Sequence, residues 1–129
     1  MCLACTLDFS RSGRLLVSAS EDNTVRLWNM RYGAGRVLAD NTHTHHEGSS
    51  YTCALFSPDE RYVAASHHDG MVRIWSARTG QLMRRVRAHV AWANDVAFMP
   101  DGKGLMSAGD KTLKYLDVSS LYATCFHVR

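Results

Sequence analysis

The sequence predicts an all-β fold built from repeated units of short antiparallel strands. One segment of the chain occurs three times, and apolar and polar residues alternate within each copy. Turn-forming residues recur roughly every ten residues along the chain. Glycine, proline and turn residues therefore interrupt the chain too often for a helix of useful length.

The repeat organises nearly the whole chain. Its copies run over Leu7–Met30, Ala54–Ala77 and Val96–Ser119. A phenylalanine opens each copy, at Phe9, Phe56 and Phe98, and the third copy is one residue shorter just before its turn aspartate. A period of roughly 40 residues with four strands per unit is typical of the blades of a β-propeller.

Each copy predicts its strands in the same order. The first strand ends at the phenylalanine, and SRSG, SPDE or MPDG follows with turn chemistry. A short apolar run comes next, and EDN, HDG or GDK then turns the chain into the closing strand TVRLW, MVRIW or TLKYL. In these closing strands we expect apolar residues on one face and Arg26, Arg73 and Lys114 on the other. A fourth strand is expected to precede each copy, most evidently at Gln81–Ala88.

Composition narrows the classes of function. The chain has 129 residues, a net charge of +3 and four cysteines. The size suits one domain, and the mild, mixed charge gives little support for direct binding of nucleic acid. No apolar run approaches the ~20 residues of a membrane span, and the N-terminus lacks the pattern of a signal peptide. The cysteine spacing indicates a reducing compartment rather than secretion.

Several motifs of the chain lie in register. The copies close on VRLWN, VRIWS and LKYLD, and the other motifs are RAH at Arg87–His89, FSPD at Phe56–Asp59 and FMPDG at Phe98–Gly102. In these motifs the chain resembles the WD-repeat family of β-propellers. The resemblance implies about three four-stranded antiparallel blades that form a propeller fragment and not a closed ring.

The resemblance also implies an organisation of the chain. A single partial propeller spans residues 1–129, with repeat units at about 2–30, 43–77 and 87–119, and residues 120–129 lie off the pattern. Tyr122–Arg129 could still add one last strand, because its apolar residues alternate. Open blade edges allow self-association, and a chain with so few blades reads as a piece of a larger protein, a truncated gene product or a partner of other chains.

Members of this family commonly contain a buried network in each blade that links a loop histidine, a turn aspartate, a strand hydroxyl and the closing tryptophan. The matching positions here are Ser18, Asp22 and Trp28 in the first copy, Asp69 and Trp75 in the second, and His89, Ser107 and Asp110 in the third. Every copy departs from the pattern: the first has no histidine before it in this sequence, and Leu116 replaces the tryptophan of the third. In the second, Ala65 replaces the hydroxyl, and the histidine would be a displaced His45 or His46. Each gap is expected to leave a buried polar group unpaired, at a cost of about 1–3 kcal/mol.

Catalytic and metal sites are disfavoured by the same alignment. Cys2 and Cys5 have the spacing of metal ligands, and a zinc site could use the loop residues His43, His45 and His46. A second pair of ligands with ordered spacing is missing, and Cys5 reads as a core position of a strand. We therefore expect no metal and no other cofactor.

Two further clusters have structural explanations. The residue types of a catalytic triad occur together at Ser107, His89 and Asp110. The repeat pattern explains these three residues as structural positions, so we do not expect an enzyme. Arg85 and Arg87 share one face of a strand and Arg84 lies on the other, so the three arginines form no continuous track for phosphates.

The resemblance implies a partner-binding surface formed by the loop before each first strand and the turn that carries the aspartate. The matching positions are Trp92 and Asn94, Ser50 and Thr52, and His67 and His68. Trp92 is the main candidate, because tryptophan is enriched among binding hot spots. Alternatively its ring covers the gap left near Leu116, and the two histidines form no more than a solvated turn.

A narrower resemblance concerns function. The segment FMPDGKGLMSAGDKTLKYLDVSSL is similar to the propeller of fungal Tup-type general transcriptional corepressors. This similarity implies a non-catalytic scaffold that docks DNA-bound repressors in the nucleus. The alternatives are a general WD-repeat scaffold, for example a substrate-recognition subunit of a ubiquitin ligase, or a truncated gene product without independent function. The alternative location is the cytoplasm.

Overall fold

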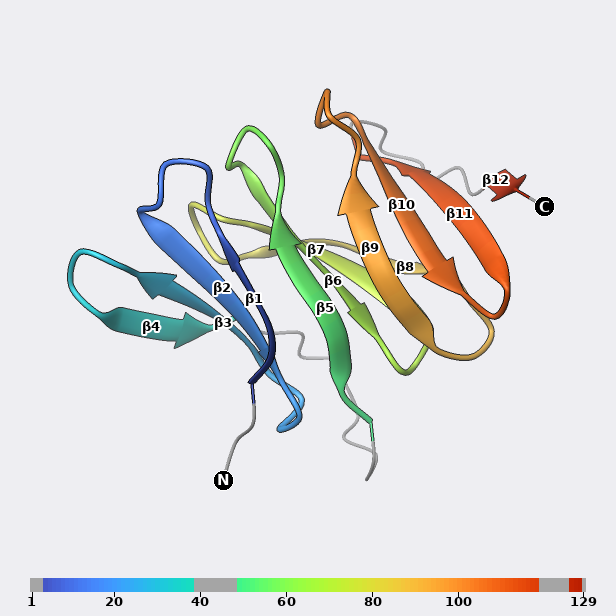
Figure 1. Ribbon diagram of the computed structural model, residues 1–129, viewed down its shortest axis with the longest axis horizontal. Helices are drawn as coiled ribbons and strands as arrows, with labels where there is room; N and C mark the ends of the chain where they lie inside the picture. The colour runs from blue at the N-terminus through green and yellow to red at the C-terminus, as the bar shows by residue number, and fades with distance from the viewer. Residues whose placement is uncertain (1–3, 39–48, 119–125, 129) are drawn as a thin grey trace.

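The computed structural model describes residues 4–38, 49–118 and 126–128, and every regular element within them is a β-strand. The strands form three four-stranded sheets, each paired in sequence order and antiparallel throughout (Figure 1). The predicted all-β fold of three four-stranded blades is therefore confirmed.

The three sheets are named blades 1, 2 and 3 in chain order. Blade 1 contains β1 (Ala4–Phe9), β2 (Leu15–Ser20), β3 (Val25–Asn29) and β4 (Ala34–Val37). Blade 2 contains β5 (Tyr51–Phe56), β6 (Tyr62–His67), β7 (Met71–Ser76) and β8 (Leu82–Arg87). Blade 3 contains β9 (Ala93–Phe98), β10 (Gly104–Gly109), β11 (Thr112–Asp117) and β12 (Phe126–Val128).

The fourth strands complete the preceding blades rather than open the following ones. The expected strand Gln81–Ala88 corresponds to β8, which pairs with β7 in blade 2 and not with β9. The end of the chain behaves in the same way, because β12 pairs with β11. The fourth strand therefore follows each copy of the repeat, because the short turn after the closing strand returns the chain along the same sheet.

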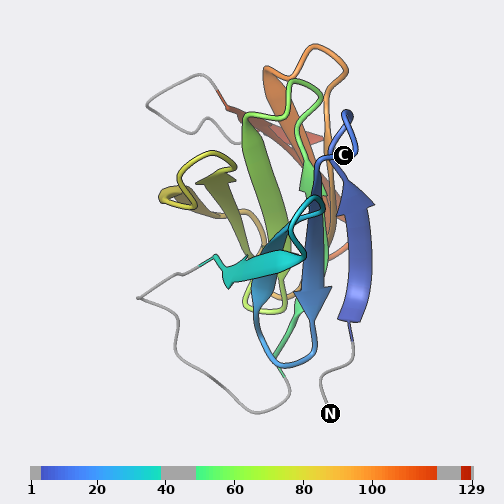
Figure 2. The same cartoon turned by 90° about the vertical axis from the view of Figure 1, so that its left-hand side faces the viewer.

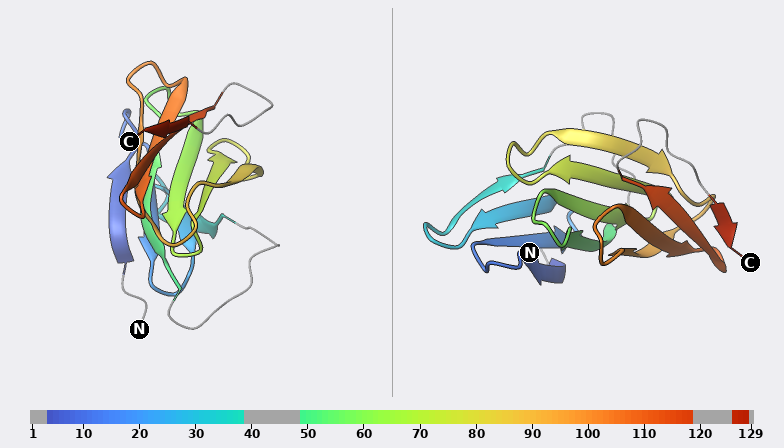
Figure 3. Two further views of the ribbon diagram at one scale, coloured as in Figure 1. Left: turned by 90° about the vertical axis from the view of Figure 1, so that its right-hand side faces the viewer. Right: turned by 90° about the horizontal axis from the view of Figure 1, so that it is seen from above.

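The blades stand side by side in an open arc. The first strands β1, β5 and β9 are neighbours across the blades and form one edge of the arc, whereas β4 and β8 lie at the opposite edge (Figures 1 and 3). Figure 2 shows blade 1 from its outward side, with β1 and β4 at the two edges of the sheet. No blade packs on this outward side within the described residues, and Leu7 and Phe9 are consequently 61% and 58% exposed.

Two separate cores fill the spaces between the blades. The first seam, between blades 1 and 2, buries Val17, Val25, Leu27, Tyr51, Phe56, Val63 and Trp75. The second seam, between blades 2 and 3, buries Ala64, Val72, Ile74, Val96, Leu105 and Leu116. Blade 2 thus has both faces covered. Arg73 lies on the face opposite Val72 and Ile74, as expected, and it is buried as well.

The residue missing from the third repeat shortens one hairpin. In blade 3 only Asp110 and Lys111 separate β10 from β11, and both have left-handed backbone conformations (φ 48° and 60°). Two left-handed residues in a two-residue loop are the geometry of a type I′ turn, which suits the twist of antiparallel strands. The corresponding turn of blade 2 spans residues 68–70 and uses Gly70 at φ 83° instead.

Candidate protein-interaction face

The candidate site lies where the β6–β7 turn, the β8–β9 loop and the β10–β11 turn meet at one end of the blades. This end is the lower edge of the sheets in Figure 1. His68 of the β6–β7 turn stacks on Trp92 of the β8–β9 loop, with ring centroids 4.1 Å apart and planes inclined by 17°. Trp92 remains 56% exposed and the nearby Val90 is 92% exposed. Blades 2 and 3 thus present an aromatic pair and an aliphatic side chain to the surroundings.

Backbone hydrogen bonds anchor the β8–β9 loop from both sides. The amides of Ala88 and His89 both donate to the carbonyl oxygen of Gly70 in blade 2, each over 3.0 Å. The amide of Ala91 donates to Oδ2 of Asp110 in blade 3 over 2.7 Å. Because its backbone is held at these points, the loop can expose Trp92 and Val90 without losing its shape.

Buried His89 fixes the same loop from beneath. Its Nε2 lies 2.9 Å from the hydroxyl of Ser107, and its Nδ1 lies 3.2 Å from the hydroxyl of Thr112. Burial, with the positive charge of Lys114, lowers the pKa of this imidazole despite the opposing charge of Asp110. A neutral ring is therefore favoured, and it can donate to one hydroxyl and accept from the other.

Two glycines make room for the loop. A Cβ on Gly70 would lie 2.1 Å from the carbonyl oxygen of His89, and the φ of 83° at Gly70 is itself unfavourable for other residues. A Cβ on Gly109 would lie 2.3 Å from the carbonyl oxygen of Trp92. Both positions bring the backbone of the loop into direct contact with a neighbouring turn.

The other residues that the sequence predicted for this surface have different roles: Ser50 and Thr52 hold neighbouring groups in place, and Asn94 is exposed. Ser50 supports His68, because its amide donates to Nδ1 of His68 over 3.2 Å and its carbonyl accepts from the amide of His68. Thr52 braces the second seam: its hydroxyl donates to the carbonyl of Ala93 over 2.6 Å and lies 2.7 Å from the hydroxyl of Ser66. Asn94 is exposed on β9.

His67 is not part of the surface, which corrects the expectation for this residue. Its side chain is fully buried in the first seam, where Nε2 lies 2.5 Å from Oδ1 of Asn23 in blade 1. The amide of Asp69 donates to Nδ1 over 3.0 Å, and the ring packs edge-on against Tyr51. Successive strand residues point to opposite faces, so the strand end separates His67 from His68.

Trp92 was expected either to bind a partner or to cover a gap near Leu116, and its position distinguishes these two roles. Its ring stacks on His68 and stays exposed, whereas Leu116 is buried within the second seam. Trp92 therefore does not cover a gap at Leu116.

The blade network is present only in parts. In blade 1, Nε1 of Trp28 donates to the hydroxyl of Ser18 over 3.0 Å, and Asp22 accepts from the amide and hydroxyl of Thr24. In blade 3, His89 reaches Ser107, but Asp110 bonds to Ala91 instead, because the shortened turn places its carboxylate against the loop.

In blade 2 an ion pair between Asp69 and Arg73 takes the place of the histidine–aspartate–hydroxyl network. Asp69 accepts from the guanidinium of Arg73 over 2.7 Å and from the amide of Met71 over 2.9 Å. Burial raises the pKa of Asp69, but the hydrogen bonds with His67, Arg73 and Met71 outweigh it and hold the pKa well below its usual range. Trp75 is fully buried beside this pair in the first seam.

The predicted cost of an incomplete network does not arise. Within the part of the chain that the structure describes, every buried side-chain nitrogen or oxygen has a hydrogen-bond partner. Thr112 supplies a second partner to His89 in blade 3, and Arg73 pairs with Asp69 in blade 2. Thus, where a blade lacks one residue of the network, the remaining network residues form hydrogen bonds or ion pairs with other partners.

Sequence reasoning missed the parts of the site that depend on the backbone. Val90 is the most exposed large apolar residue of the site, and Gly70 accepts the hydrogen bonds that anchor the loop. The only signal for Val90 was its position between His89 and Trp92. The signal for Gly70 was a glycine in a turn, which does not reveal the loop that its carbonyl contacts.

The described residues contain neither a cluster of metal-ligand side chains nor a helix that could span a membrane. Across residues 4–38, 49–118 and 126–128 no three His, Cys, Asp or Glu side chains gather as metal ligands would. Cys2, His43, His45 and His46 lie outside the described residues, as does the side chain of Cys5. The described elements contain no helix suited to crossing a membrane.

Comparisons with known proteins identify the repeat. The family model described as "WD domain, G-beta repeat" matches residues 2–29, 40–76 and 80–117. Among curated proteins, nuclear distribution protein PAC1 of Arthroderma benhamiae is 32% identical over 120 residues, covering 84% of this chain and 25% of that protein.

Human proteins match over similar lengths of the chain. Protein Atg16l2 of Homo sapiens is 35% identical over 105 residues, which cover 79% of this chain and 16% of that protein. Apoptotic protease-activating factor 1 of Homo sapiens is 30% identical over 110 residues, covering 79% of this chain and 8% of that protein. The chain spans a quarter or less of the length of these relatives. With its three repeats in register and its propeller-type blades, the chain belongs to the WD-repeat family.

Proposed function

We propose that the chain is a non-catalytic docking module that binds other proteins through the end of blades 2 and 3 formed by His68, Val90 and Trp92. WD-repeat domains are generally non-catalytic scaffolds for protein–protein interaction. The observation that supports this site is the stacked, exposed pair of His68 and Trp92 on an anchored loop.

The loop that carries Trp92 is already ordered for binding. A partner that buries Trp92 gains a large apolar area, and tryptophan is enriched among binding hot spots. The loop is already held by Gly70, His89 and Asp110, so binding would cost little further ordering of the backbone. A stacked histidine beside the indole adds a polar edge that can orient the partner.

The identity of the partner is a narrower proposal. The similarity of the third repeat to fungal Tup-type corepressors supports a DNA-bound repressor as the partner and a nuclear location. The curated relatives support a broader range of scaffolds, because they include nuclear distribution protein PAC1, apoptotic protease-activating factor 1 and protein Atg16l2. A general scaffold, such as the substrate-recognition subunit of a ubiquitin ligase, is the second candidate.

Affinity capture with matched variants tests the site and the partner class together. The purified chain and its Trp92→Ala variant would be immobilised and incubated with cell extract, and the retained proteins would be quantified by mass spectrometry. Tyr32→Ala is the control, because Tyr32 is 72% exposed on the β3–β4 turn at the other end of blade 1. We expect Trp92→Ala, but not Tyr32→Ala, to lose specific proteins.

The captured proteins discriminate the candidates. DNA-binding repressors would support the corepressor role, whereas ubiquitin-ligase subunits would support the second candidate. Equal capture by the parent and the Trp92→Ala variant would contradict the proposed site. A parent chain that captures nothing would favour a product without independent function.

A further inference from the structure

A groove crosses the first seam at the end of the blades opposite the candidate interaction face. It consists of two adjoining hollows of ≈ 400 and ≈ 490 Å³ whose linings share Leu15, Asn29, Ala77 and Arg78. The β1–β2, β5–β6 and β7–β8 turns contribute to its walls, together with the end of β3 and with β4. Alternate turns of an antiparallel meander lie at the same end. The groove is therefore separate from the surface formed by His68 and Trp92.

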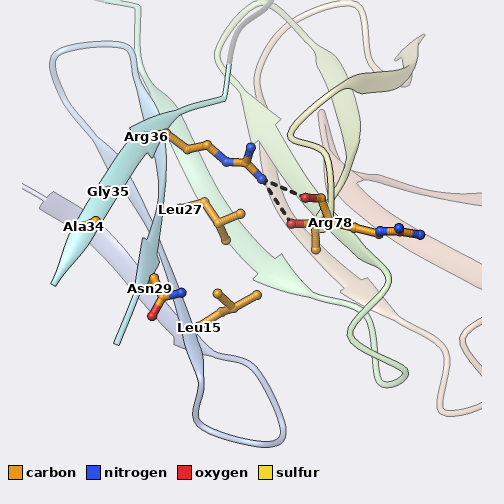
Figure 4. A pocket seen from close by; sticks show the side chains of 8 residues that line it. Leu15, Leu27, Asn29, Ala34, Gly35, Arg36 and Arg78 are labelled. Atoms are coloured by element: carbon orange, nitrogen blue, oxygen red, sulfur yellow. Dashed lines mark hydrogen bonds between the residues drawn. The ribbon is translucent and has the colours of Figure 1, made fainter. Parts of the chain in front are cut away.

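The floor of the groove is apolar. Leu15, Leu27 and Ala77 lie along it, and Figure 4 shows the side chain of Leu27 between those of Arg36 and Leu15. Asn29 stands at the edge of the floor, where its Oδ1 accepts from the amides of Arg31 and Tyr32 and its NH2 group can donate to a ligand. One or two apolar side chains of an extended segment could be accommodated here.

Arg36 spans the groove from blade 1 to blade 2. Its guanidinium donates to the carbonyl oxygens of Ala77, Arg78 and Thr79, over 3.4, 3.2 and 3.1 Å. None of these acceptors carries a formal charge, so the contact fixes the cation in place without neutralising it. Held by three carbonyls, the guanidinium is preorganised to face a carboxylate.

The rim of the groove adds further positive charge. Arg14 and Arg78 are exposed, and the side chain of Arg78 extends away from the floor (Figure 4). No carboxylate of the described residues forms an ion pair with either arginine or with Arg36. The acidic residue in the lining, Glu60, accepts a hydrogen bond from the amide of Ser12, and this bond, with the nearby charge of Arg14, lowers its pKa. Three arginines therefore face one carboxylate.

We infer that this groove binds an acidic peptide segment that places an apolar side chain on Leu15 and Leu27 and its carboxylates near Arg14, Arg36 and Arg78. The apolar floor and the fixed position of Arg36 favour a peptide over nucleic acid, which would need a continuous series of phosphate contacts. The chain then offers two docking ends, and the second does not depend on the proposed role of Trp92.

Fluorescence anisotropy on the whole chain tests this inference directly. The probe is a fluorescein-labelled, C-terminally amidated peptide of sequence Glu-Glu-Leu-Glu-Glu. Control peptides carry Gln in place of Glu, or Gly in place of Leu. We expect the acidic Leu peptide to bind most tightly and its affinity to fall as salt is raised.

Matched variants locate the binding. The double variant Arg14→Glu/Arg78→Glu reverses two rim guanidinium charges that no hydrogen bond among the described residues uses, and we expect it to weaken binding by about tenfold. Arg11→Glu reverses an exposed charge on the same β1–β2 turn at a residue that does not line the groove, and it should change the affinity little. Trp92→Ala should leave the affinity unchanged, which separates this site from the proposed interaction face.

Three results would overturn the inference. The acidic Leu peptide could fail to bind the parent chain, or the Gln peptide could bind equally well. The double variant could retain the parent affinity while its circular dichroism melt matches that of the parent. A labelled single-stranded oligonucleotide that bound in place of the peptide, with the same dependence on Arg14 and Arg78, would assign the groove to nucleic acid instead.

Discussion

The two seams of the molecule join equivalent strands with different side chains. The first seam is filled by large rings, with Trp75, Tyr51 and Phe56 all buried. The second seam is filled mainly by aliphatic side chains, and Leu116 occupies the position that corresponds to Trp75. One blade architecture therefore tolerates an indole or a leucine at the same place when the facing residues change with it.

The polar links across the seams differ in a way that bears on function. In the first seam side chains reach across: Asp8 accepts from the amide of Phe56, and Arg36 reaches the carbonyls of blade 2. Side chains also reach across the second seam, from Thr52 to the carbonyl of Ala93 and from Arg84 to the carbonyl of Asp117. At this seam the carbonyl of Gly70 additionally holds the backbone of the β8–β9 loop. Backbone anchoring leaves Val90 and Trp92 free to face a partner, which explains why the candidate site lies at the second seam.

The largest expected effect comes from emptying the first seam. Trp75→Ala should lower the free energy of unfolding by about 3–5 kcal/mol, because it removes a fully buried ring and leaves a cavity. The equivalent change Leu116→Ala should cost about 2–5 kcal/mol and less than Trp75→Ala. Urea unfolding followed by circular dichroism measures both, and a larger loss for Leu116→Ala would contradict the comparison.

Gly70→Ala should break the anchor of the second seam. A Cβ at this left-handed position would lie 2.1 Å from the carbonyl oxygen of His89, so backbone strain and a steric clash add together. We expect a loss of about 2–5 kcal/mol in the free energy of unfolding, together with weaker capture of partners through Trp92.

Gly33→Ala is the matched control for this change. Gly33 also has a left-handed backbone, at φ 67°, but a Cβ there would meet no atom within 4 Å. The control therefore measures backbone strain alone, about 1–3 kcal/mol. Equal losses for the two variants would show that the contact between Gly70 and the loop adds nothing.

Leu116→Trp sharpens the comparison by restoring the ring that the other blades have. The second seam is packed around leucine, so the larger ring should overpack it and destabilise the fold by about 1–3 kcal/mol. Thermal unfolding followed by circular dichroism would detect the change. A stabilised variant would mean that the second seam retains room for an indole.

The smallest expected effect is the change of the melting temperature with pH. The folded state lowers the pKa of His89 through burial, so its neutral form stabilises the fold above the unfolded pKa of about 6.5, and this stability is lost as pH falls below that value. The melting temperature should therefore decrease between about pH 7.5 and about pH 5. His89→Gln retains hydrogen-bonding groups without titrating there, so its decrease should be smaller. A decrease as large as that of the parent would assign the pH dependence to other groups.

The fold was largely predictable, because it depends on local patterns. The repeat, the alternation of apolar residues and the turn motifs predicted the strands and the three blades. They misassigned β8, because pairing between strands depends on contacts that periodicity does not specify. The burial of Arg73 was also missed, since one face of a strand becomes interior only when another blade packs on it.

The candidate site was predictable only in part. Trp92 and His68 were expected on one surface, but their stacking and the role of Val90 require the three-dimensional arrangement of two blades. His67 was misplaced because adjacent residues at a strand end can face a core and the surroundings. Gly70 anchors the loop through its backbone carbonyl oxygen, and a pattern of side chains in the sequence does not predict which amides that oxygen will accept from.

The most direct test of the proposed interaction face is the indole N–H region of the NMR spectrum. The chain has three tryptophans, and the Trp92→Ala and Trp28→Phe variants would assign their signals. On addition of a partner identified by capture, we predict that the Trp92 signal shifts or broadens while the signal of buried Trp75 does not move. A partner that binds while the Trp92 signal stays unchanged would contradict the proposal that this end of blades 2 and 3 is the docking surface.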